Sequence, residues 1–154
     1  MYDILIKNGT VIDGSGRPMY RADVAIKNNS IVTIGDLLSA SAERVIDATD
    51  QYVTPGFIDV NNHADTYWQL LAHPELESLL YQGITTIIGG NSGSSLAPLA
   101  DPETIRSIQK WTDIEKINFN WLSMQEFLRE VKLRRPAVNF ATLVGHGTLR
   151  RGAM

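Results

Sequence analysis

Two polar residues able to bind a metal follow a short apolar run near the middle of the sequence. Phe57-Ile58-Asp59-Val60 is typical of a buried strand, and Asn61 and His63 come just after it. Because side chains alternate along a strand, residues 61 and 63 are expected to face one ion from the same side. Imidazole is a good zinc ligand, whereas asparagine offers a neutral carbonyl oxygen better suited to hard cations. Alternatively, His63 caps hydrogen bonds at the strand end and Asn61 is a turn residue.

Four more residues are candidates for chemistry. Ser92 lies in a glycine-rich segment after a β-branched run, where a structural role is the alternative to a functional one. His146 lies between two glycines in an expected loop, and it either lines a substrate pocket or holds that loop. Arg150 either binds a substrate carboxylate through paired hydrogen bonds or stays solvated. Asp65 either orients His63 near the substrate or belongs to a turn.

The composition excludes several classes of chemistry. The 154 residues include no cysteine, which rules out a disulfide scaffold, a thiolate nucleophile and a cysteine-based zinc site. A formal net charge of -3 without a basic stripe argues against a nucleic-acid partner. No apolar run reaches the roughly 18 residues of a membrane span, and the first residues do not resemble a signal peptide. We therefore expect a cytoplasmic protein.

The first third of the chain predicts short β-strands. Asn8-Gly9 is a favoured tight-turn dipeptide and is expected to join the first two strands as a hairpin. A second turn is expected at Asn28-Asn29. Closely spaced short strands are typical of a small β-sandwich or meander. The expected strands are residues 4–6, 10–12, 22–27, 31–34 and 44–47.

The pattern changes after Pro55-Gly56 to alternating strands and helices. Ser123 and Glu126 form a capping box at the start of a helix that Pro136 closes. The other expected elements are strands at 57–60, 84–88 and 138–144, a helix at 74–81 capped by Gly83, and a helix from Asp101 to about Trp111. This order implies a parallel α/β arrangement with right-handed crossovers. An eightfold barrel takes about 250 residues, so we interpret the chain as the front end of a longer protein.

Three motifs resemble the N-acyl-D-amino-acid deacylases of the amidohydrolase superfamily. The first runs from Val45 through the Pro-Gly-Phe-Ile-Asp strand to His63, and the whole superfamily shares it. The second (residues 82–99) and the third (residues 144–154) are more specific to the deacylases. The resemblance implies a small β-sandwich-type domain over residues 1–54, completed by later strands. It also implies that residues 55–154 form the first three strand–helix units of a TIM-like (β/α) barrel.

The resemblance further implies a reaction and a cofactor. In the family a metal-bound hydroxide attacks the amide carbonyl of an N-acyl-D-amino acid and an aspartate moves the proton. The implied metal is divalent, zinc by analogy, with His63 as a ligand and Asn61 and Ser92 at two other ligand positions. The family has histidine where Asn61 stands and cysteine where Ser92 stands, so both residues should weaken the site. The aspartate base is expected beyond residue 154, and this chain is not expected to catalyse alone.

Two other interpretations stay open. A non-catalytic homologue, which associates with a complementary chain or with itself, is favoured by the replaced ligand positions and the abrupt end. A serine hydrolase using Ser92 is the weaker one, because residues 90–94 lack the last glycine of a nucleophile elbow and residues 95–98 are a poor helix start. Under the main hypothesis the partner is a small N-acyl-amino-acid substrate, with no membrane or nucleic acid involved.

Overall fold

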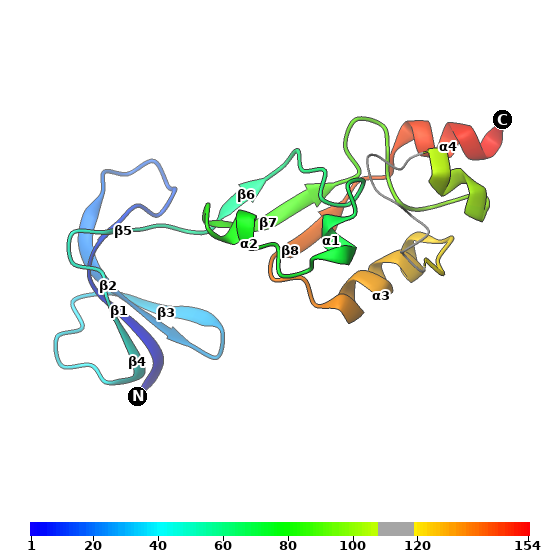
Figure 1. The fold of residues 1–154 in the computed structure, drawn as a ribbon. Coiled ribbons are helices and arrows are strands. Elements are labelled where there is room, and N and C mark those ends of the chain that lie inside the picture. The colour runs from blue at the N-terminus through cyan, green and yellow to red at the C-terminus, as the bar shows by residue number, and fades with distance from the viewer. Residues whose placement is uncertain (108–118) are drawn as a thin grey trace. The chain divides into compact units, whose positions relative to one another are not determined.

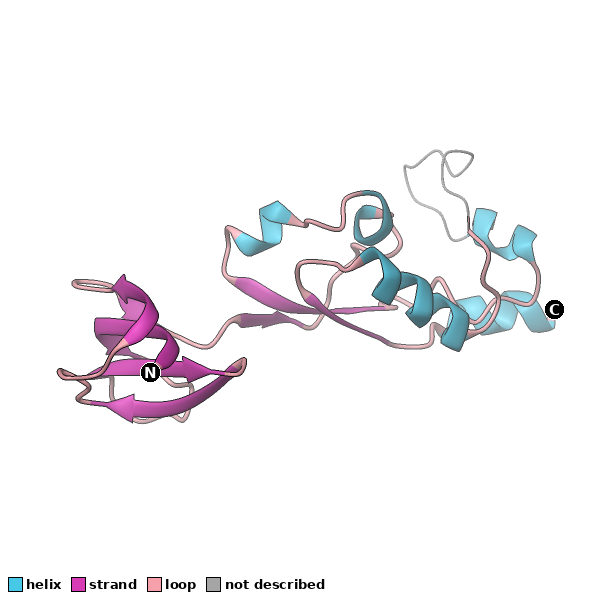
Figure 2. Ribbon diagram, turned by 90° about the horizontal axis from the view of Figure 1, so that it is seen from below, coloured by secondary structure: helices cyan, strands magenta, loops and turns pink. Residues whose placement is uncertain are grey.

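Strands make up the first part of the chain, and strands alternate with helices in the second (Figures 1 and 2). The computed structural model describes residues 1–107 and 119–154, which divide into two units, Met1–Pro55 and Gly56–Met154. All described helices belong to the second unit. The region around Trp111, where the sequence predicts the end of a helix, lies outside the described residues.

The first unit is one five-stranded sheet with the order β3-β2-β1-β4, and β5 also pairs with β1. β1 and β2 are antiparallel, as are β2 and β3, whereas β4 and β5 run parallel to β1. The predicted turn at Asn28-Asn29 joins β2 to β3, and both residues have positive φ. Residues 1–55 thus form a single layer and not both layers of a sandwich. The strands are β1 Tyr2–Val11, β2 Tyr20–Lys27, β3 Ser30–Gly35, β4 Ala42–Asp47 and β5 Tyr52–Val53.

The predicted hairpin at Asn8-Gly9 is wrong, because these residues form a bulge within the single strand β1. The register between β1 and β2 shifts between Ile6 and Gly9, and Asn8 has a φ of 64°. The Asn8 backbone N–H donates to Oδ1 of Asp23 at 2.9 Å, and its side-chain amide donates to Oδ1 of Asp47 at 3.0 Å. Carboxylates from two neighbouring strands therefore stabilise a bulge at a dipeptide that is typical of a tight turn.

The second unit contains the predicted parallel sheet, with the order β6-β7-β8. The chain therefore has the mixed α/β class that was expected. The strands are β6 Phe57–Asp59, β7 Ile84–Gly89 and β8 Asn139–Thr142. The helical segments are α1 Gln69–Ala72, α2 Glu77–Leu80, the 3-10 helix η1 Pro102–Ser107, α3 Met124–Arg134 and α4 His146–Ala153.

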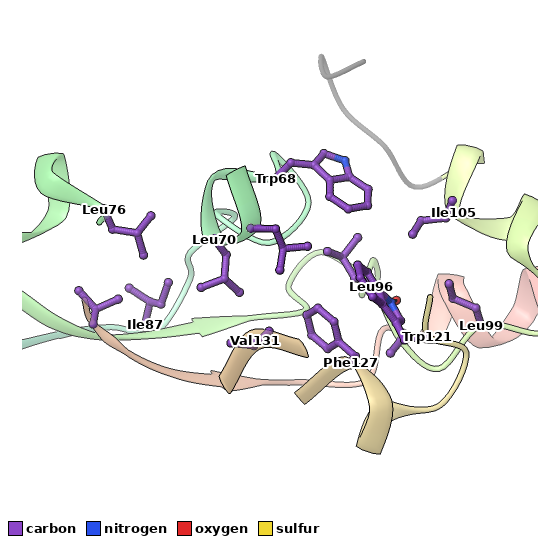
Figure 3. Close-up of a cluster of buried hydrophobic side chains, with 13 residues drawn as sticks. Trp68, Leu70, Leu76, Ile87, Leu96, Leu99, Ile105, Trp121, Phe127 and Val131 are labelled. Atoms are coloured by element: carbon purple, nitrogen blue, oxygen red, sulfur yellow. The ribbon is translucent and has the colours of Figure 1, made fainter. Parts of the chain in front are cut away.

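The core of this unit lies between the sheet and its helices (Figure 3). The predicted capping box at the start of α3 is confirmed, with Ser123 and Glu126 bonded reciprocally. Phe127 lies one turn into α3, and its ring centroid is 5.4 Å from that of Trp121 and 6.0 Å from that of Phe140. These contacts pack α3 onto β8 and thereby fix the helix that precedes the last strand.

The helix predicted at residues 74–81 is reduced to α2, because Leu76 takes a left-handed conformation (φ 41°) and is buried. Burial of this leucine overrides the helical pattern that Pro74 suggested. The predicted cap at Gly83 is wrong, because the shortened helix is capped by Tyr81. Gly83 ends the turn that follows, where it has a φ of 75° and donates its N–H to the Leu80 carbonyl at 2.9 Å. No helix among residues 1–107 and 119–154 combines the length and apolar character that a membrane span requires.

Candidate functional site

The parallel sheet brings three segments with candidate residues to one edge. Asp59 pairs with Ile87, and Gly89 pairs with Thr142, so the carboxyl ends of β6, β7 and β8 lie next to one another. Asn61 and His63 follow β6, Ser92 follows β7, and His146 follows β8. Ligands of open α/β sheets bind at this edge, so it is the candidate functional site.

The segment after β6 is a turn that Asp59 organises. Its Oδ1 accepts a hydrogen bond from the Asn61 backbone N–H at 3.0 Å, and its Oδ2 accepts one from the Asn62 side chain at 2.7 Å. The strand ends at Asp59, so the alternation used to place Asn61 and His63 on one side does not extend to them. A shared ion at these two residues therefore stays a prediction.

His63 has one ring nitrogen inside the protein. Its Nδ1 is buried and has no hydrogen-bond partner among the described residues. The ring packs edge-on against Tyr67, with centroids 6.4 Å apart. The other nitrogen, Nε2, is therefore the atom through which His63 can meet a ligand.

Asp65 is buried, with 1% of its surface exposed, and its carboxylate accepts hydrogen bonds from the backbone. Oδ1 accepts from the Thr66 N–H at 2.8 Å and Oδ2 accepts from the Gly90 N–H at 2.7 Å. Burial raises the pKa of this carboxyl, and the two backbone hydrogen bonds and the nearby His63 oppose the rise. These contacts hold the β6 and β7 segments together and leave no surface for a substrate, so Asp65 does not fit the predicted substrate contact.

Ser92 is exposed at the tip of the loop after β7, with a φ of 56°. The neighbouring Asn91 side chain donates to the carbonyls of Ile88 at 2.6 Å and Asn62 at 3.2 Å, which ties this loop to the segment after β6. Residues 93–101 contain no helix, whereas a nucleophile elbow leads from strand into helix. This loop therefore argues against the serine-hydrolase interpretation.

His146 is the first residue of helix α4, which corrects its predicted place in a loop. Gly145 is the N-cap and packs so closely on the loop after β7 that an added Cβ would lie 2.6 Å from the Gly93 carbonyl oxygen. His146 and Arg150 are both exposed and are spaced by four residues. Residues at this spacing share a helix face, so the structure places these two predicted substrate contacts side by side on α4.

Sequence reasoning missed the buried hydroxyl pair Ser95 and Thr148, which joins the loop after β7 to α4. The Thr148 hydroxyl accepts from the Ser95 N–H at 2.9 Å and donates to the Ser95 carbonyl at 3.0 Å. The Ser95 hydroxyl accepts from the Gly145 N–H at 2.9 Å and donates to the Ala97 carbonyl at 2.7 Å. Each residue is unremarkable in the sequence, because its partner lies 53 positions away.

The described residues do not by themselves fit a zinc ion. Within residues 1–107 and 119–154 no three His, Asp or Glu side chains form a group that could hold a metal. A histidine that binds a metal normally donates its second N–H to an acceptor, but the buried Nδ1 of His63 has no acceptor among the described residues. Asn61 and Ser92 would add only neutral oxygens. The described residues alone therefore do not form the zinc site predicted at His63, Asn61 and Ser92, and that site stays a prediction.

Comparison with known proteins identifies the family of the chain. The model of the amidohydrolase family matches residues 44–154. The chain belongs to the amidohydrolase family. This part of the chain contains the parallel sheet and all three segments at its carboxyl edge, so the candidate site lies within the amidohydrolase match.

The most similar relatives of this amidohydrolase chain include deacylases. It is 40% identical to an N-acyl-D-aspartate deacylase of Alcaligenes xylosoxydans xylosoxydans over 152 residues, which cover 99% of the chain and 30% of that enzyme. It is 37% identical to a D-aminoacylase of the same organism, covering 99% and 31%. The crystal structure of an N-acyl-D-glutamate deacylase from Bordetella bronchiseptica, complexed with zinc and a phosphonate inhibitor, matches with a TM-score of 0.83 at 33% identity, covering 99% and 31%. The chain thus spans about a third of the length of these relatives.

Proposed function

We propose that this chain is part of an amidohydrolase that cleaves the amide bond of N-acyl-D-amino acids. The reaction adds water across the bond: the carbonyl carbon gains a hydroxyl, the C–N bond breaks and the amine nitrogen takes a proton. The products are a carboxylate and a free D-amino acid. The support is that the relatives are deacylases of D-amino-acid derivatives and match nearly the whole chain.

The proposed architecture follows from the same comparison. Residues 55–154 would form the first strand–helix units of a (β/α) barrel, and residues 1–54 a small β-domain. Three parallel strands with helical crossovers support the first assignment, and the single sheet of the first unit supports the second. In a (β/α) barrel the active site lies at the carboxyl ends of the strands.

We assign roles only to residues of this chain. Arg150 on the exposed face of α4 would bind the α-carboxylate of the substrate, and His146 would line the pocket beside it. His63 would direct Nε2 towards the scissile amide. Asp65 would position the loop after β7 without touching the substrate. Because the described donors do not fit zinc, we assign no step to a metal held by them.

One observation carries the proposal: three segments bearing His63, Ser92 and His146 are joined by hydrogen bonds at one carboxyl edge of a parallel sheet. The test is release of free amine by the longest natural form of the protein, not by residues 1–154 alone, from matched N-acetyl-D- and N-acetyl-L-amino acids. We expect cleavage of the D-series. Arg150→Ala should raise KM about tenfold, as expected for loss of a charged hydrogen bond. Arg17→Ala, an exposed arginine of the first unit, is the matched control.

The replaced ligand positions favour a second candidate, a non-catalytic homologue. Asn61 and Ser92 weaken a family-type metal site, and so does His63, whose Nδ1 has no partner in the described part of the chain. In that case the protein would release no amine from either series, with or without added zinc. D-specific release would exclude this candidate.

A further inference from the structure

A cavity of about 550 Å³ lies beside His63 in the second unit. Its lining runs from Asn62 to Leu79, so it extends from the candidate site to α2. Small-molecule pockets typically measure roughly 300–1,000 Å³, which places this cavity in the range for a metabolite. The turn after β6 therefore provides a binding volume that adjoins the residue proposed to face the amide.

One part of the cavity lining is apolar. Ala64, Leu76 and Leu79 line it, Leu76 belongs to the buried core, and the other two pack against that core. Side chains anchored in this way offer a fixed apolar surface to a ligand. A chain of methylene groups would gain free energy by packing on it.

The charge of the lining is negative. Glu75 and Glu77 both contribute, and no lysine or arginine is among the described residues that line the cavity. Nδ1 of His73 lies 3.4 Å from Oε1 of Glu75. The Glu77 carboxylate has no ion pair or hydrogen bond with any residue in the described part of the chain. A cationic group in the cavity would therefore find an unpaired carboxylate, and an anionic group would be repelled.

We propose that this cavity receives the side chain of the substrate, and that this side chain is long and basic, as in an N-acyl-D-lysine. The inference rests on the proposed deacylase function, because His63 at one end of the cavity would face the amide. The methylene stem would lie on the leucines and the ammonium group at Glu77. A D-aspartate or D-glutamate side chain, which the names of two relatives specify, would place a carboxylate against Glu75 and Glu77.

The test measures binding separately from turnover. N-acetyl-D-lysine, N-acetyl-D-leucine and N-acetyl-D-glutamate are titrated into the purified chain, and the NMR shifts of residues 62–79 report occupancy. We expect N-acetyl-D-lysine to bind most tightly and to lose affinity as salt is raised. Glu77→Gln should weaken its binding about fivefold, the scale of a partly exposed ion pair, and should improve binding of N-acetyl-D-glutamate. Glu77→Asp should retain the preference, and Glu43→Gln in the first unit should change nothing.

Equal or tighter binding of N-acetyl-D-glutamate by the unaltered chain would overturn the proposal, and so would failure of N-acetyl-D-lysine to bind. Loss of affinity for all three ligands equally in Glu77→Gln would also overturn it, since charge would then not set the preference. The two proposals can fail separately. Binding of N-acetyl-D-lysine without cleavage would reject the deacylase function and support the role proposed for the cavity. Preferential cleavage of acidic substrates would support the deacylase function and reject that role of the cavity.

Discussion

Oδ2 of Asp65 accepts a 2.7 Å hydrogen bond from the backbone N–H of Gly90, so a carboxylate that follows β6 holds the loop that follows β7. Gly89 and Gly90 permit this close approach, since a Cβ on Gly89 would lie 2.6 Å from the same oxygen. The contact is buried and connects residues 25 positions apart. It directly joins the two segments of the candidate site that bear His63 and Ser92.

Replacing Asp65 by asparagine should destabilise the second unit. The variant amide can present an N–H₂ group to a backbone N–H, which leaves a buried donor without an acceptor and costs about 1–3 kcal/mol. Urea unfolding measures the loss. Asp50→Asn, at an exposed position whose positive φ suits asparagine, should change stability by less than about 0.5 kcal/mol. Equal stability of the two variants would contradict the role given to Asp65.

Gly90→Ala should lower the free energy of unfolding by more than the positive φ of Gly90 alone would. An added Cβ would collide with the Leu143 carbonyl oxygen at the end of β8. Gly14 has a similar φ of 77° with nothing within 4 Å, so Gly14→Ala isolates the backbone cost, about 1–2 kcal/mol. We expect Gly90→Ala to lose at least about 1 kcal/mol more than this control in urea unfolding. A matching loss would mean that Leu143 moves aside freely.

The capping box of α3 predicts a pH-dependent stability. Backbone hydrogen bonds from Leu122 and Ser123 lower the pKa of Glu126 from 4.5 to about 2. Because folding lowers this pKa, the stabilisation is complete above pH 4.5 and is lost as the pH falls towards 2. As the pH is lowered between these values, the Tm of the natural chain should therefore fall more steeply than the Tm of Glu126→Gln. Glu43→Gln should follow the natural chain, and parallel curves for all three proteins would refute the prediction.

The replaced ligand positions give a gain-of-function prediction. Asn61→His combined with Ser92→Cys adds an imidazole and a thiolate to the segments at this edge of the sheet. The affinity for zinc should rise about 10–100-fold. Isothermal calorimetry of the apo protein with zinc gives the affinity without any activity measurement. Asn29→His combined with Ser41→Cys adds the same groups to the first unit as a control. No gain over this control would show that residues 61 and 92 do not face a common ion.

The sequence predicted the elements whose signals are local. The β-branched run at Ile84–Ile88 is β7, and the Ser123–Glu126 capping box begins α3, because both depend on residues within one strand or one helical turn. The fold of residues 74–81 could not be read in this way. Leu76 is buried against a core that other segments supply, and this long-range packing shortens the helix to α2.

The candidate site was predictable in its residues but not in its connections. The positions of His63, Ser92 and His146 at strand ends follow from the strand order, and the parallel pairing confirms that order. Asp65 has a role that the sequence did not reveal, since its partner Gly90 comes from another strand. The bulge at Asn8 was missed for the same reason, because Asp23 and Asp47 are distant in sequence.

The Ser95–Thr148 pair has a consequence for exchanging parts between relatives. Each hydroxyl bonds to the main chain of the other segment or its own, so the shape of both segments depends on the hydroxyl groups at residues 95 and 148. A chimera in which either position lacks its hydroxyl would leave buried backbone groups of the other segment without a partner. Transplants of new specificity into this scaffold should therefore move both stretches as one cassette.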